Sequence, residues 1–127
     1  MGIEALWTVE FKSLVENVHD SIVGFTGVIV LETGKVFGGD SWRWYQGDYG
    51  PKDPETGHHS FTLSTHPHPY PPPSAHQFAT FPQTETKDYV GILAGTPDLD
   101  LLTLELRLLG DPRILLLGEL TWVADLP

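Results

Sequence analysis

Apolar and polar residues alternate over several short stretches of this chain. In residues 6–13 the apolar residues Trp7, Val9 and Phe11 are each separated by one polar residue. Successive side chains of an extended strand point to opposite faces, so this spacing is typical of a half-buried antiparallel strand. We therefore predict a strand over residues 6–13.

The same pattern predicts further strands with turn residues between them. Thr33-Gly34 is expected to form a tight hairpin turn, and Gly110-Asp111-Pro112 a second one. Gly38-Gly39-Asp40 is expected to break the chain as a glycine-rich turn. The predicted strands after the first cover residues 24–32, 35–37, 41–48, 58–65, 86–94, 99–109 and 113–123.

The leucine-rich segment 99–109 also invites a helical interpretation. However, Leu102, Leu104, Leu106 and Leu108 recur at every second position, and the residues between them, Thr103, Glu105 and Arg107, are all polar. A helix would repeat its apolar positions at three and four residues, so a strand is favoured.

These elements predict an all-β protein with a single domain over residues 1–127. Regularly spaced short strands are typical of a sandwich or a closed barrel, and closure removes exposed strand edges. We expect a small antiparallel β-barrel of about eight strands. The segment His66–Pro73 is rich in proline, which donates no ladder hydrogen bond, so an extended surface connection is predicted there.

The composition limits the partners and the compartment. The formal net charge is −10, and the seven basic residues are scattered, so we expect no direct binding to nucleic acid. The acidity serves solubility or attracts a basic partner. The chain has no cysteine, no signal-like start and no apolar run long enough to cross a membrane as a helix, which predicts a cytoplasmic protein without membrane contact.

No complete catalytic motif is present. There is no Gly-x-Ser-x-Gly, and Gly38-Gly39-Asp40 lacks the Lys-Ser that a phosphate-binding loop requires. His66 and His68 could share one side of an extended chain as a metal pair, but no cysteine or carboxylate spacing completes a site. We expect no metal, no cofactor and no enzymatic activity.

Large aromatic residues recur on the predicted strands. In a small barrel they either line an apolar ligand cavity or fill a solid core, and the core interpretation is favoured because eight strands enclose little free space. The candidate lining residues are Trp7, Phe11, Trp42, Trp44, Phe61 and Trp122.

Three segments in order resemble the GrlR-type family, small proteins named for a negative regulator of type III secretion. They are a Trp-containing strand (residues 6–11), a hairpin running into Gly-Gly-Asp (residues 27–40) and a Tyr-x-Gly strand (residues 45–49). The resemblance implies a lipocalin-like, eight-stranded antiparallel barrel, often dimeric, that binds a transcriptional activator. It also implies partner contact through the loop after the Tyr-x-Gly strand. Here that loop is Pro51–Thr56, with Asp53 and Glu55 as its acidic residues.

The leading hypothesis is therefore a non-enzymatic, regulatory protein-binding barrel, whose partner is another protein of the transcriptional-regulator kind. A homodimer is compatible with this hypothesis. The alternative is a carrier of a small apolar, lipid-like ligand in the barrel interior.

Overall fold

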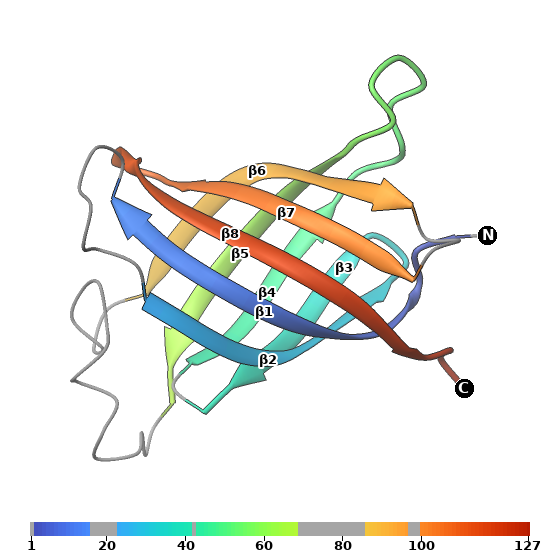
Figure 1. Cartoon of the computed structure of the whole chain (residues 1–127), viewed down its shortest axis with the longest axis horizontal. Coiled ribbons are helices and arrows are strands. Elements are labelled where there is room, and N and C mark those ends of the chain that lie inside the picture. The colour runs from blue at the N-terminus through green and yellow to red at the C-terminus, as the bar shows by residue number, and fades with distance from the viewer. Residues whose placement is uncertain (1, 16–22, 42, 69–85, 97–99) are drawn as a thin grey trace.

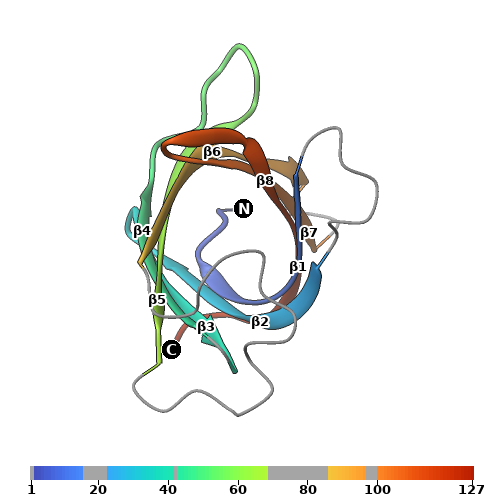
Figure 2. The same ribbon diagram turned by 90° about the vertical axis from the view of Figure 1, so that its left-hand side faces the viewer.

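The computed structural model describes residues 2–15, 23–41, 43–68, 86–96 and 100–127. Its eight strands form a closed antiparallel barrel in which each strand pairs with the next in sequence and the last pairs with the first (Figures 1 and 2). No helix in the described ranges is long and apolar enough to cross a membrane. The strands are β1 Ala5–Val15, β2 Val23–Glu32, β3 Lys35–Asp40, β4 Arg43–Tyr49, β5 His59–Pro67, β6 Lys87–Thr96, β7 Leu101–Leu108 and β8 Asp111–Ala124.

The predicted fold class is confirmed. Two local predictions are confirmed as well, namely the hairpin turn at Thr33-Gly34 and a strand, instead of a helix, in the leucine-rich segment. Thr33 and Gly34 both have positive φ angles, 46° and 80°, as a two-residue hairpin turn of the primed type requires. In β7 the four even-numbered leucines are buried, which confirms a strand instead of a helix.

The prediction of a turn at Gly38-Gly39-Asp40 is wrong, because these residues complete β3 and pair with β2. A Cβ atom on Gly38 would lie 2.1 Å from the carbonyl oxygen of Val28. The glycine therefore permits close approach of two strands and does not mark a reversal of the chain.

The His-Pro segment also begins differently from the prediction. His66 and Pro67 belong to β5 and pair with β4, so the strand runs two residues further than expected. Pro67 is tolerated because it is the last residue of the strand, where a missing donor disrupts little of the ladder. The remainder of the predicted surface connection, from residue 69 onward, lies outside the described residues.

The core lies inside the barrel and is made by alternate residues of the strands. The buried apolar residues of all eight strands form one cluster, which explains why apolar residues recur at a spacing of two. The largest fully buried members are Trp7, Phe11, Ile29, Leu31, Tyr45, Phe61, Leu63, Leu93, Leu102, Leu104, Leu106 and Leu120.

Candidate functional site

The connection between β4 and β5 projects from the barrel at the end where both chain termini lie (Figure 1). Its residues 51–56 are all exposed, as predicted for this loop. The loop is nevertheless held by its own backbone, since Asp53 N–H donates to the His58 carbonyl and Gly57 N–H donates to the Asp53 carbonyl, each at 2.8 Å. It is a closed hairpin with a defined shape.

The two acidic residues of this loop have different roles. One Asp53 carboxylate oxygen accepts the Glu55 backbone N–H at 2.8 Å, so Asp53 helps to form the turn. Within the described chain, the Glu55 carboxylate makes no hydrogen bond or ion pair. The Glu55 carboxylate is therefore available to solvent or to a partner. The Asp53 carboxylate is charged too, but it also stabilises the turn.

A pocket with a volume of about 660 Å³ lies between this loop and the outer side of β5 and β6. Lys52, Asp53 and His58 line it from the loop, and Ile92 contributes an apolar part of the wall. The His59 ring fixes the base of the loop, because its Nδ1 atom lies 2.8 Å from the Gly50 carbonyl oxygen. A side chain from a binding partner could enter here while contacting the loop.

The aromatic residues named as candidates for the barrel interior lie in different environments in the structure. Trp7, Phe11 and Phe61 lie in the core and are at most 1% exposed. Trp44 points outward, 39% exposed, and stacks on His66 with the ring centroids 4.1 Å apart. For Trp44 the prediction of an inward position is wrong. Trp42 lies outside the described residues.

Trp122 pairs with Trp7 across β1 and β8, which places it on the inward side of its strand. It lies at the end of the barrel, next to a register shift, and is 38% exposed. With this exposure it does not belong to the buried core cluster.

The interior side chains are packed against one another. A side chain facing a space large enough for water would keep accessible surface, whereas the candidate lining residues Trp7, Phe11 and Phe61 are at most 1% exposed. Eight-stranded barrels are just wide enough to be filled by side chains. The packing of these residues favours the core interpretation of the aromatics over the ligand cavity.

A polar group inside the other end of the barrel was not predicted. Arg43 is only 5% exposed, and its guanidinium donates from Nε to Thr65 Oγ1 at 2.9 Å and from Nη2 to the Thr65 carbonyl at 2.8 Å. Asp40 accepts the Arg43 backbone N–H at 2.8 Å and the Tyr45 hydroxyl proton. These contacts tie β3, β4 and β5 together where the barrel turns from β3 into β4.

Burial raises the pKa of the Tyr45 phenol far above its usual value, and the nearby Asp40 carboxylate raises it further. Burial also raises the pKa of Tyr89, although the positive charge of Arg43 opposes this shift. Both phenols therefore stay protonated in the folded protein at a pH where an exposed tyrosine ionises.

This difference predicts how stability depends on alkaline pH. Unfolding releases both phenols, which then ionise near pH 10, while the folded state retains the protons. The contribution of Tyr45 and Tyr89 is intact below about pH 10, and it declines above that by about 1.4 kcal/mol per pH unit for each residue. Tyrosinate absorbance during alkaline titration, followed before and after adding denaturant, measures the effect. Full ionisation of all four tyrosines in the folded state would contradict it.

His66 and His68, whose spacing allowed a metal pair, contact different groups in the structure. His66 lies on the outer face, where its Nδ1 is 3.0 Å from Thr86 Oγ1, whereas Nε2 of His68 is 2.7 Å from the Asp40 carbonyl oxygen. Among the described residues no group of three or more His, Asp or Glu side chains is arranged to hold a metal ion.

The fold defines the chain as a small, closed, eight-stranded antiparallel β-barrel. Neither models of known protein families nor curated proteins gave a match to the sequence.

Proposed function

We propose that this chain is a non-enzymatic regulatory barrel that binds another protein through the connection between β4 and β5. This connection, residues 50–58, is called the 50–58 loop below. The observation that carries the proposal is the projecting hairpin, which is closed by its own hydrogen bonds and presents Asp53 and Glu55 to solvent. A preformed loop loses little conformational freedom on binding, so more of its contact energy contributes to affinity.

The charge of the chain indicates the chemistry of the partner. With a formal net charge of −10, the barrel attracts basic surfaces and repels acidic ones over a distance of several ångströms. The resemblance to GrlR-type proteins supports a transcriptional regulator as that partner, and a cytoplasmic setting. The packed core around Trp7 and Phe61 supports this proposal over the lipid carrier.

The test is capture of protein partners from native lysate by the purified chain and by loop variants. Asp53→Asn keeps the oxygen that accepts the Glu55 N–H but removes the charge, and Glu55→Gln removes the second charge. We expect the double variant to bind the captured partner about tenfold more weakly, chiefly through slower association. Binding is measured by surface plasmon resonance.

The matched control is Glu32→Gln, which removes one exposed carboxylate beside the β2–β3 turn at the same end of the barrel. Its affinity for the captured partner should change less than twofold. A partner that binds the double loop variant as tightly as the unchanged chain would refute the role of the loop, as would the absence of any stoichiometric partner.

A further inference from the structure

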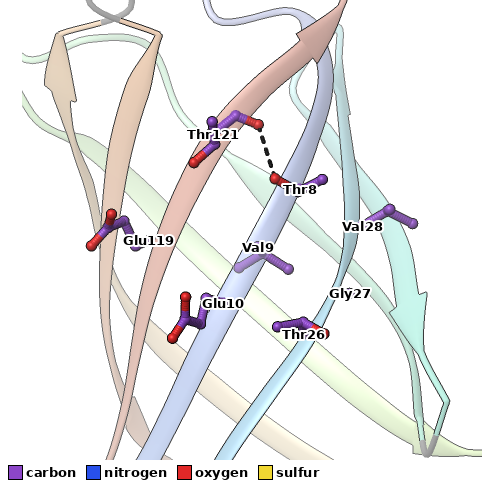
Figure 3. A pocket seen from close by; sticks show the side chains of 8 residues that line it. All are labelled: Thr8, Val9, Glu10, Thr26, Gly27, Val28, Glu119 and Thr121. Carbon is purple, nitrogen blue, oxygen red and sulfur yellow. Dashed lines mark hydrogen bonds between the residues drawn. The ribbon is translucent and has the colours of Figure 1, made fainter.

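A second surface, distinct from the 50–58 loop, lies on the outer wall of the barrel over β8, β1 and β2 (Figure 3). It is a shallow groove with polar walls and one exposed apolar residue at its edge. The side chains that line it on the outer face are Thr8, Glu10, Thr26, Val28, Glu119 and Thr121.

Two carboxylates face each other in this groove. Glu10 of β1 and Glu119 of β8 are direct cross-strand partners, and both side chains are exposed on the same outer face. Like charges in directly opposite positions destabilise an antiparallel pair. In the described part of the chain neither carboxylate forms an ion pair or hydrogen bond. The repulsion between Glu10 and Glu119 would be relieved by a cationic group from outside.

An exposed apolar patch adjoins the groove. Val28, at the groove's edge, pairs with Gly39 of β3, and Gly39 pairs with Trp44 of β4. Because Gly39 has no side chain, Val28 and Trp44 flank a bare stretch of backbone on the outer face. Phe37, two residues along β3, extends the patch, and it is 54% exposed. Contiguous exposed apolar residues of this kind mark interaction sites on soluble domains.

We propose that the groove and the patch together bind a basic amphipathic segment of a partner protein. Lysine or arginine side chains of the segment pair with Glu10 and Glu119, and its apolar side chains pack on Val28, Phe37 and Trp44. This inference rests on the proposed function, because it gives the same basic partner a second contact.

The occupant is a basic segment because the alternatives conflict with the charges. A second copy of the chain would bring its own net charge of −10. If it docked symmetrically, it would place more carboxylates against Glu10 and Glu119. An apolar ligand would leave the two carboxylates without a cation.

The test is an NMR titration of the isotope-labelled chain with a short synthetic peptide in which lysine and leucine alternate. Amide resonances of Glu10, Thr26, Glu119 and Thr121 should shift, and the Glu10→Gln/Glu119→Gln double variant should bind the peptide about tenfold more weakly. The control Glu105→Gln removes an exposed carboxylate of β7, which lies 4.0 Å from Arg107, and should leave the affinity unchanged.

Each result decides the proposal. Shifts confined to the 50–58 loop would overturn the groove while leaving the proposed function in place. Equal binding of a peptide that alternates lysine and serine would overturn the part played by Val28, Phe37 and Trp44. Suppose that resonances at the groove shift and that the loop variants bind the captured partner as tightly as the unchanged chain. These two results would support binding at the groove and refute binding at the 50–58 loop.

Discussion

Gly47→Ala is expected to lower the free energy of unfolding by about 3 kcal/mol. A Cβ atom at position 47 would lie 1.9 Å from the carbonyl oxygen of Thr62 on β5, where ordinary contact requires well over 3 Å. The obstacle is backbone in a paired strand, so it cannot rotate away as a side chain would. The barrel has to open the β4–β5 ladder at this point, which weakens several hydrogen bonds at once.

The matched control is Gly24→Ala on β2. A Cβ there would meet nothing closer than 3.9 Å, and alanine loses less conformational entropy on folding than glycine. Its stability should change by less than about 0.5 kcal/mol or rise slightly. Urea denaturation followed by tryptophan fluorescence measures both variants. If Gly47→Ala were as stable as Gly24→Ala, the close approach of β4 and β5 would be disproved.

The same geometry occurs at Gly91, whose added Cβ would lie 1.9 Å from the Glu105 carbonyl oxygen on β7. Such glycines let a barrel strand bend sharply where neighbouring backbones come close. Gly47 and Gly91 thus act at two separate strand pairs, β4–β5 and β6–β7.

The strands could be predicted from the sequence because one face of each is buried. A spacing of two, as in Leu102 to Leu108, has one structural explanation when turn residues bound the segment. Glycines carry less information, because the same residue serves a turn at Gly34 and a close approach at Gly38. Only the pairing of strands distinguishes these two uses.

The assignment of faces in β4 shows a second limit. The sequence Arg43-Trp44-Tyr45 alternates, but hydropathy alone favours burying the tryptophan and exposing the arginine. The barrel does the opposite: Arg43 and Tyr45 are buried on the inward face of β4, and Trp44 lies on the exposed outer face. Arg43 is accommodated inside because Thr65 lies within hydrogen-bond distance on the next strand.

Of the two candidate binding surfaces, the exposed 50–58 loop could be predicted from the sequence, whereas the groove over β8, β1 and β2 could not. Two prolines and two glycines mark residues 49–57 as a loop in any fold. The opposition of Glu10 and Glu119, 109 positions apart in sequence, arises only when β8 closes the barrel onto β1. Long-range register of this kind leaves no local pattern in the sequence.

Arg43→Ala is expected to destabilise the protein by about 4 kcal/mol. The substitution removes a large buried side chain, and it leaves the Thr65 carbonyl without the donor that lies 2.8 Å away. Arg43→Met restores most of the packed volume without the charge, so it should recover about half of that loss. Thermal and urea denaturation of both variants measure these values.

A double-mutant cycle with Thr65→Val isolates the interaction itself. Thr65→Val keeps the shape of the side chain but removes the hydroxyl that accepts the Arg43 Nε–H. Alone it should cost about 2 kcal/mol, because a buried charged donor is left without its acceptor. In the Arg43→Met background no such donor remains, so the same change should cost less than about 0.5 kcal/mol. Equal costs in the two backgrounds would mean that Thr65 stabilises the barrel by packing, and that the guanidinium is satisfied by other groups.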